Sequence, residues 1–249
     1  MTDLNLSDKP TIVLVHGAFA ESASWDDVIR SLQAQGYTAI AAANPLRSLS
    51  GDAEAVATLL TSIAGPIVLV GHSYGGEVIS AAARDNENVR ALVFVAAFAP
   101  DEGENAIILS SRFPGSSLGE SLRPVPLADG SNDLYIQAEK FHQQFAADVP
   151  ADKAALMAAT QRPVRDVALG EAFAGAPAWK SIPSWFVNAE LDQNIPIAVQ
   201  RFMSERAGAR DVIEVAGASH AVGVSRPEQV VESILQATSS VMAPLSTTD

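Results

Sequence analysis

Short apolar runs rich in β-branched residues alternate with longer helical patterns along most of this chain. The runs are bounded by glycine and polar turn residues, and each has the length of a buried strand rather than of a helix. Strands separated by helices pair in parallel through right-handed crossovers, which leaves helices on both faces of the sheet. We therefore predict an α/β fold with a mostly parallel sheet. Its expected strands, about six, span 11–17, 37–43, 67–71, 89–97, 184–190 and 211–217.

The alternation stops after Pro100 and resumes at the fifth expected strand. The segment between contains loop-rich stretches, among them RPVPLADGSND, and then a helical pattern that is broken at Pro150. It contains no convincing buried strand. With 249 residues and 48% hydrophobic content, the chain is long enough to bury one sizeable core. We therefore expect a core domain, residues 1–100 and 181–249, that carries a helical lid, residues 101–180.

The charge balance and composition argue against several classes of protein. The net charge is -13, whereas nucleic acid and anionic membranes attract basic surfaces. The chain has no cysteine, which excludes disulfides, thiolate metal sites and a cysteine nucleophile. The first ten residues, MTDLNLSDKP, lack the features of a secretory signal, and no apolar run reaches the roughly 20 residues of a membrane helix. We expect a cytoplasmic protein with neither nucleic acid nor membrane as a partner.

A serine flanked by glycines lies where the third expected strand meets a helix. Gly71, Ser73 and Gly75 form the pattern G-x-S-x-G, with IVLV before it and EVISAAA after it. A serine on such a sharp turn is exposed at the sheet edge, whereas a side chain at either glycine would clash with neighbouring elements. The turn also places backbone N–H groups near the position where an oxyanion would form. We predict that Ser73 is a nucleophile rather than a turn serine that caps its helix.

With this strand–turn–helix arrangement, the chain resembles the α/β-hydrolase superfamily, in which nucleophile, acid and base follow one another in that order. The resemblance implies an acid after a late strand, and Asp192 in NAELDQNIP matches that position. An aspartate there would accept a hydrogen bond from the base and hold its tautomer. Glu190 is a local alternative, and Asp101, after the fourth strand, matches an acid position found in some members of the superfamily.

The same order implies a base after the last strand, where His220 lies in VAGASHAVGVSRPE. Histidine is the side chain whose ordinary pKa suits general-base work near neutral pH. Three other histidines are expected to have different roles. His16 ends the first strand and matches a structural HG pair of the family, His72 supports the serine turn, and His142 belongs to the lid.

The turn after the first strand, HGAFAES, resembles the family's first oxyanion loop. The resemblance implies that the backbone N–H groups of Ala18 and Tyr74 form the oxyanion hole. Phe19 is a neighbouring candidate for the first donor. Each donor of this kind contributes roughly 2.7–4 kcal/mol to transition-state stabilisation.

Three motifs, HGAFAESASWDDVI, GHSYGG and VFVAAFAPDEGE, resemble most closely the plant methyl-esterase-like branch, which includes bacterial carboxylesterases similar to pyrethroid-hydrolysing enzymes. The resemblance implies a serine carboxylesterase that cleaves small to medium apolar esters through an acyl-enzyme and requires neither metal nor organic cofactor. Apolar bulk in the lid is expected to cover the pocket over Ser73. The candidate substrate contacts are Phe19, Trp25, Phe141, Phe145 and Trp179.

Other activities are consistent with the same three predicted catalytic residues, Ser73, Asp192 and His220. Cofactor-free perhydrolases (haloperoxidases) and lactonases share them, and a ligand receptor can retain the hydrolase fold. Hydroxynitrile lyases of the closest branch carry a lysine after the base, whereas this chain has Ala221. Release of product from an ester in repeated turnovers distinguishes an enzyme from a receptor.

Overall fold

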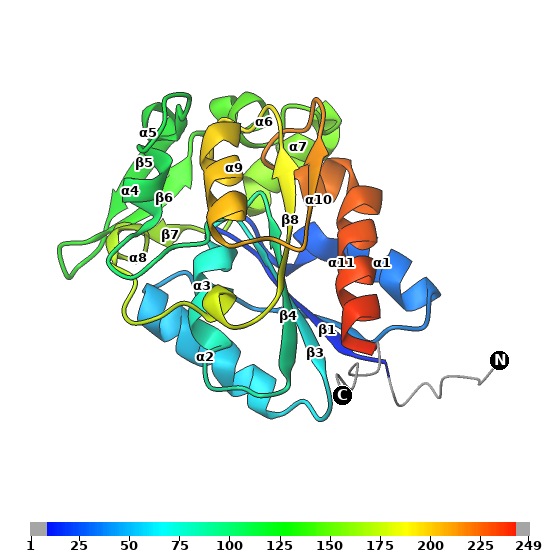
Figure 1. The fold of residues 1–249 in the computed structure, drawn as a ribbon. Coiled ribbons are helices and arrows are strands. Elements are labelled where there is room, and N and C mark those ends of the chain that lie inside the picture. The colour runs from blue at the N-terminus through cyan, green and yellow to red at the C-terminus, as the bar shows by residue number, and fades with distance from the viewer. Residues whose placement is uncertain (1–8, 243–249) are drawn as a thin grey trace.

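The computed structural model describes residues 9–242 and has a six-stranded sheet at its centre (Figure 1). Every strand pair is parallel, in the order β2-β1-β3-β4-β8-β9. The predicted α/β fold with about six strands is therefore confirmed. No helix in this part of the chain is long and apolar enough to cross a membrane. The strands are β1 Thr11–Val15, β2 Ala39–Ala42, β3 Ile67–His72, β4 Val89–Val95, β8 Ser184–Ala189 and β9 Asp211–Val215.

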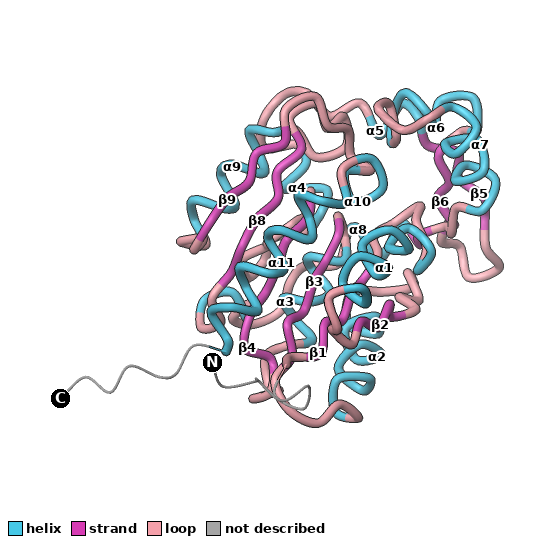
Figure 2. The backbone as a smooth tube through the Cα atoms, turned by 90° about the vertical axis from the view of Figure 1, so that its right-hand side faces the viewer, coloured by secondary structure: helices cyan, strands magenta, loops and turns pink. Residues whose placement is uncertain are grey.

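Both faces of the sheet are covered by helices, as the view in Figure 2 also shows. In β3, Val68 and Val70 belong to one apolar cluster, and Ile67 and Leu69 belong to the other. This alternation explains why the strand is apolar throughout, and each fully buried side chain contributes about 1.5–3 kcal/mol. The helices are α1 Asp26–Ala34 and α11 Pro227–Met242 on one face, and α2 Leu49–Thr61, α3 Gly75–Ala82 and α9 Ile197–Arg206 on the other.

The segment between β4 and β8 contains helices and a small sheet. Besides the expected helices it contains β5, β6 and β7, which form a three-stranded antiparallel sheet that the sequence did not indicate. The stretch RPVPLADGSND, which the sequence indicated as loop, forms most of the β5–β6 hairpin. The elements are α4 Ala106–Ser110, α5 Leu118–Ser121, β5 Leu122–Pro126, β6 Asn132–Ile136, α6 Ala138–Phe145, α7 Ala151–Thr160, β7 Val164–Arg165, α8 Asp166–Gly170 and η3 Ala178–Lys180.

This inserted segment lies at the carboxyl ends of the central strands (Figures 1 and 2). Arg165 donates its backbone N–H to the carbonyl of Leu46, in the loop after β2, at 3.0 Å. Ala221, in the loop after β9, donates to the carbonyl of Phe145 at 2.9 Å. The carboxyl edge is where ligands bind in open α/β sheets. Two short helices lie in the loops at this edge: η2 Ser22–Trp25 and α10 Val222–Ser225.

Backbone strain also concentrates at this edge. Four non-glycine residues among those described have positive φ, and each follows one of the first four strands. A non-glycine residue in this region costs about 1–3 kcal/mol and persists only where the surrounding structure enforces it. The strain therefore marks the loops that surround the end of β3. The residues are Phe19 (61°), Leu46 (61°), Ser73 (57°) and Ala96 (42°).

Glu77 on α3 is buried, and neither of its carboxylate oxygens has a hydrogen-bond partner among the described residues 9–242. Burial raises the pKa of Glu77 well above its ordinary value. Above that ordinary value the folded chain therefore binds a proton that the unfolded chain has released. The free energy of unfolding then falls as pH rises, by about 1.4 kcal/mol per pH unit, until the raised pKa is passed.

Replacing Glu77 with glutamine should therefore stabilise the protein at pH 8, because the amide keeps the shape of the side chain and does not ionise. The gain should shrink toward pH 5, where wild-type Glu77 is already neutral in the folded state. Urea unfolding at both pH values measures this difference. Glu54→Gln, at an exposed position on α2, is the matched control. Equal gains at both pH values would contradict the expectation.

Candidate active site

Ser73 follows β3 directly and is held on a strained turn with φ 57°. Its backbone N–H donates to the carbonyl of Val95 in β4 at 3.2 Å. Its own carbonyl accepts from the N–H groups of Gly76 at 2.9 Å and Phe98 at 3.1 Å. The turn is thus fixed from both neighbouring segments, as required of a nucleophile that must not move during reaction.

The glycines around Ser73 are required by close backbone approach. A Cβ on Gly71 would lie 2.6 Å from the carbonyl oxygen of Gly75, and one on Gly75 would lie 2.5 Å from that of Val15. A Cβ on Gly17, in the turn after β1, would lie 2.5 Å from Cβ of Ser73. All three distances are shorter than real Cβ contacts, so the first turn packs directly against the serine turn.

The backbone N–H groups of Ala18 and Tyr74 form no hydrogen bond within residues 9–242. Ala18 follows Gly17, and Tyr74 precedes the first residue of α3. Both residues line the same cavity as Ser73. The N–H of Phe19, the alternative first donor, also has no partner within these residues, and Phe19 lines the same cavity. Free donors beside the serine, from Ala18 or Phe19 and from Tyr74, are what an oxyanion requires, and the positive end of the α3 dipole adds to the attraction.

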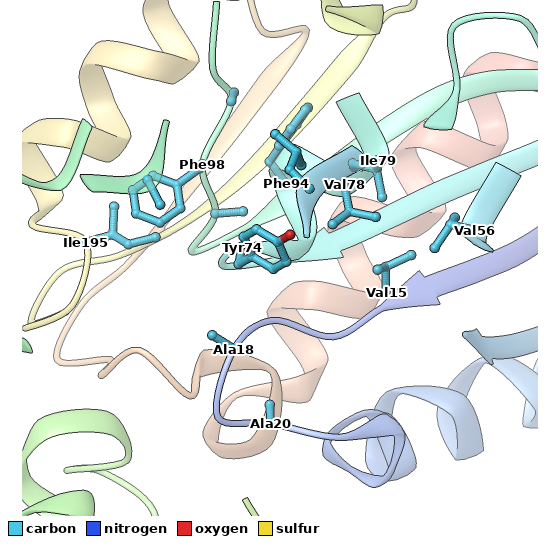
Figure 3. Packing of buried hydrophobic residues seen from close by; sticks show 14 of the residues in the cluster. Val15, Ala18, Ala20, Val56, Tyr74, Val78, Ile79, Phe94, Phe98 and Ile195 are labelled. Carbon is cyan, nitrogen blue, oxygen red and sulfur yellow. The ribbon is translucent and has the colours of Figure 1, made fainter. Parts of the chain in front are cut away.

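The side chain of Tyr74 points away from these donors into the core. Its hydroxyl donates to Oδ2 of Asp52 on α2 at 2.9 Å. Figure 3 shows its ring between Val78 on one side and Phe98 with Ile195 on the other. Burial raises the pKa of both the Tyr74 hydroxyl and the Asp52 carboxyl. The ring therefore anchors the backbone of Tyr74, and only its N–H is available for chemistry.

His220 and Asp192 form a buried pair. The distance between Nδ1 of His220 and Oδ2 of Asp192 is 2.7 Å. Both side chains are almost wholly inaccessible to solvent. A carboxylate only accepts, so Nδ1 carries the proton and Nε2 is the free basic nitrogen of the neutral ring. Nε2 has no partner within the described residues.

Asp192 is held by three further donors. Its Oδ1 accepts from the backbone N–H groups of Asn194 at 2.7 Å and Ile195 at 2.9 Å. Its Oδ2 also accepts from Nε2 of Gln200 on α9 at 3.0 Å. These bonds offset the cost of burying a carboxylate and fix the oxygen that contacts His220. Gln200 was not among the predicted site residues, because a glutamine within a helical pattern does not indicate which residue its side chain will contact.

The other acid candidates lie elsewhere. Asp101 pairs with Nζ of Lys180 at 2.5 Å on the surface. Glu190 is exposed and accepts from the backbone N–H of Gly217 at 2.7 Å. Of the three candidates, Asp192 is the one that contacts His220.

Two further histidines support the site in a neutral state. His72 donates from Nε2 to the carbonyl of His220 at 2.9 Å, which ties the base loop to the residue before Ser73. His16 donates from Nδ1 to the carbonyl of Gly17 and accepts the backbone N–H of Asn44 at Nε2. Burial lowers the pKa of His72 to about 3 and that of His16 to about 4. His142, in the lid, donates to the carbonyl of Val149 and lies outside this cluster.

These depressed pKa values predict instability in mild acid. Below the ordinary histidine value of 6.5, the unfolded chain binds protons that the folded chain refuses. His16 and His72 should each therefore lower the free energy of unfolding by about 1.4 kcal/mol for each pH unit below 6.5, down to their folded values. His72→Gln should remove one of these two contributions. Urea unfolding at pH 7, 6 and 5 measures it, and parallel slopes for variant and wild type would contradict it.

Lid helix α6 contacts both loops that carry the acid and the base. Gln144 donates to the carbonyl of Gln193 at 3.0 Å and to Oδ1 of Asn194 at 2.8 Å, in the acid loop. The Phe145 ring packs edge-on against His220, with centroids 4.9 Å apart. Just beyond α6, Asp148 accepts from the backbone N–H of Ser219 at 3.2 Å. The lid at this end is therefore part of the framework that positions both residues.

A cavity of about 230 Å³ lies between the core and the lid and contains Ser73. Its lining is mainly apolar. The core contributes Ala18, Phe19, Tyr74, Phe98, Asn194 and Ile195 beside the serine. The lid contributes, among others, Ile107, Leu118, Leu122, Leu134 and Leu169.

Of the five aromatic residues proposed as substrate contacts, Phe19 lines this cavity. Trp25 packs edge-on against His72, and Phe141 stacks on Phe145 at 5.0 Å. Trp179 donates its indole N–H to the carbonyl of Pro100 at 2.8 Å. These four rings are buried outside the lining of this cavity. The sequence missed the aliphatic residues of α4, α5 and α8 that line the pocket in their place.

A parallel sheet, a strained serine turn after β3 and a buried Asp192–His220 pair together form the arrangement typical of α/β hydrolases. Residues 12–233 match the model of the Alpha/beta hydrolase family. The chain belongs to this family.

Relatives extend over nearly the whole chain. It is 28% identical to Esterase PIR7B of Oryza sativa subsp. japonica, over 94% of this chain and 97% of that protein. It is 27% identical to a pyrethroid hydrolase of Sphingobium wenxiniae, over 90% of this chain and 85% of that protein. Among solved structures, polyneuridine aldehyde esterase superposes with a TM-score of 0.79 at 20% identity, covering 92% of this chain and 98% of that one.

Proposed function

We propose that the protein is a serine carboxylesterase with Ser73 as nucleophile, His220 as base and Asp192 as acid. The observation that carries the proposal is the buried Asp192–His220 pair. It leaves Nε2 free, and its histidine is hydrogen-bonded through its own carbonyl to the residue before Ser73. Relatives named as esterases support the same reaction class.

In the first half of the proposed reaction, Nε2 of His220 takes the hydroxyl proton of Ser73 as the serine oxygen attacks the ester carbonyl. The N–H groups of Ala18 and Tyr74 hold the oxyanion. The intermediate collapses by breaking the bond to the alcohol oxygen, which receives the proton from His220. The alcohol leaves, and the acyl group stays on Ser73.

In the second half, His220 removes a proton from water as the water oxygen attacks the acyl-enzyme. Collapse then breaks the bond to Ser73, the serine oxygen regains its proton, and the carboxylic acid leaves. Throughout, Asp192 keeps the proton of His220 on Nδ1, so that Nε2 accepts and returns protons.

The cavity supports esters of small to medium size with apolar substituents. Its 230 Å³ lies below the range of about 300–1,000 Å³ found for drug-sized ligands. Its walls are mainly aliphatic, so apolar acyl or alkyl groups are favoured over charged ones. The naming of two relatives as a pyrethroid hydrolase and an esterase is consistent with this class.

Hydrolysis of a panel of p-nitrophenyl and alkyl esters tests the proposal. The expected result is repeated turnover, with alcohol and acid released in equal amounts and many equivalents per protein. Release of one equivalent that then stops, or ligand binding with no product from any ester, would show that the protein is not an esterase.

A further inference from the structure

Phe19 separates the cavity that contains Ser73 from a second apolar space. The second space, here called the outer groove, has a volume of about 220 Å³ and lies between the turn after β1 and lid helix α7. Among the residues described, Phe19 is the one that lines both spaces. Its side chain is nearly fully buried, with 3% exposed. Phe19 is therefore a buried residue that borders both spaces rather than a surface group.

The outer groove is suited to binding an apolar hydrocarbon chain. Ala20, Met157 and Val224 contribute apolar walls. Four charged residues also line it, namely Glu21, Asp26, Asp27 and Lys153, and Lys153 pairs with Asp27 at 2.9 Å. Since three of these four are carboxylates, the groove favours an uncharged apolar chain over an anionic one.

The position of the ring is set by the backbone. Phe19 has φ 61° and lies between Ala18, an oxyanion donor in the proposed reaction, and Ala20; both alanines are labelled in Figure 3. A phenylalanine in this conformation costs about 1–3 kcal/mol, so the surrounding turn must enforce it. The geometry that presents the Ala18 N–H to the serine thus also fixes the ring between the two spaces.

Resting on the proposed esterase activity, we propose that Phe19 is the specificity-determining residue for substrate length. Its ring ends the reactive cavity and limits substrates to esters with short apolar substituents. With a smaller residue there, the two spaces join, and their volumes together fall within the range of about 300–1,000 Å³ for larger ligands. The outer groove then accepts the far end of a long apolar chain.

The test compares kcat/KM for p-nitrophenyl decanoate with that for p-nitrophenyl butanoate. Phe19→Ala should raise the ratio of the longer to the shorter ester by about 10- to 100-fold, since each methylene buried adds about 0.8 kcal/mol. Phe19→Leu should give a smaller rise. A ratio that changes by less than about threefold in both variants overturns the proposal.

A second substitution tests whether the long apolar substituent of the ester occupies the outer groove. Met157→Trp fills the outer groove and should return the ratio of Phe19→Ala toward that of the wild type, because Met157 lines the groove and not the inner cavity. Leu134→Ala is the matched control, since it enlarges the inner cavity from the lid side. Any rise caused by Leu134→Ala should persist with Met157→Trp. Equal reversal in both backgrounds contradicts the proposed route.

Binding distinguishes this proposal from the esterase proposal. In Ser73→Ala protein, adding Phe19→Ala should tighten binding of methyl decanoate by about tenfold or more relative to methyl butanoate, as calorimetry can measure. If the native protein hydrolyses no ester but this binding shift appears, the proposed reaction fails and the role of Phe19 stands. If hydrolysis occurs and neither the kinetic nor the binding shift appears, only the role of Phe19 fails.

Discussion

Replacing Ser73 with alanine is expected to lower kcat for p-nitrophenyl butanoate by about 10⁴- to 10⁶-fold. The variant has no oxygen to form the acyl-enzyme, so neither the free Nε2 of His220 nor the donors of Ala18 and Tyr74 can act on a covalent intermediate. What survives is the modest acceleration that an oxyanion hole and substrate binding provide. Initial rates with freshly purified protein, together with mass spectrometry for an acyl adduct in the wild type alone, measure the effect.

The loss in Ser73→Ala should not reflect unfolding. The Ser73 hydroxyl makes no hydrogen bond within residues 9–242, and the turn is fixed by backbone bonds that alanine retains. Ser80→Ala is the matched control: Ser80 lies on α3, the helix that follows the serine turn, and donates to the carbonyl of Gly76 at 2.7 Å. It should lose about 1 kcal/mol of stability and retain turnover. Comparable turnover in Ser73→Ala and Ser80→Ala would remove Ser73 from the mechanism.

The parts of the fold that could be predicted from the sequence are those whose residue pattern is determined by their immediate surroundings. Strands buried on both faces are apolar throughout, and G-x-S-x-G needs glycine because of backbone approach at Gly71 and Gly75. The β5–β6 hairpin was missed because it is half-buried and contains Pro124 and Pro126. Proline is tolerated in β5 because β5 is an edge strand. The residue patterns of β5 and β6 therefore did not resemble that of a buried strand.

The contacts that position the candidate site come from distant segments, and no local pattern encodes them. Gln200 and Gln144 are glutamines in amphipathic helices, and they are buried only because the acid loop folds against both. Phe141 and Phe145 were expected in the pocket wall, but they belong to the apolar core cluster. The sequence shows that lid residues are apolar, but it does not show which surface each side chain packs against. Asp192 and His220 could be predicted together because they follow Ser73 in the order of acid and base that the resemblance to the α/β-hydrolase superfamily implies.

The contacts of α6 constrain how the lid can act. Gln144 binds the acid loop, while Phe145 and Asp148 contact the loop of His220. Movement of α6 away from the core would break these bonds and free both loops at once. Substrate entry by opening of this end would thus dismantle the proposed catalytic arrangement. On α4, Ile107 lines the cavity and is 56% exposed.

Replacing Asp192 with asparagine is expected to lower kcat by about 10⁴-fold with little change in KM. The carboxylate accepts the Nδ1 proton of His220, whereas an amide can present an N–H toward the same nitrogen. The imidazole then favours the tautomer with its proton on Nε2, which cannot accept a proton from Ser73. Steady-state kinetics with p-nitrophenyl butanoate measure the loss, and thermal unfolding checks that the variant is folded.

Asp101→Asn is the matched control for the acid, because Asp101 is the other aspartate among the acid candidates that the sequence left open. Its carboxylate pairs with Lys180 at the surface, where an ion pair is worth about 0–1 kcal/mol. The substitution should therefore leave kcat within about twofold of the wild type. A loss of several orders of magnitude in Asp101→Asn, with turnover retained in Asp192→Asn, would reverse the assignment. A large loss confined to Asp192→Asn would tie the reaction to the buried pair, since the two variants make the same chemical change at different distances from His220.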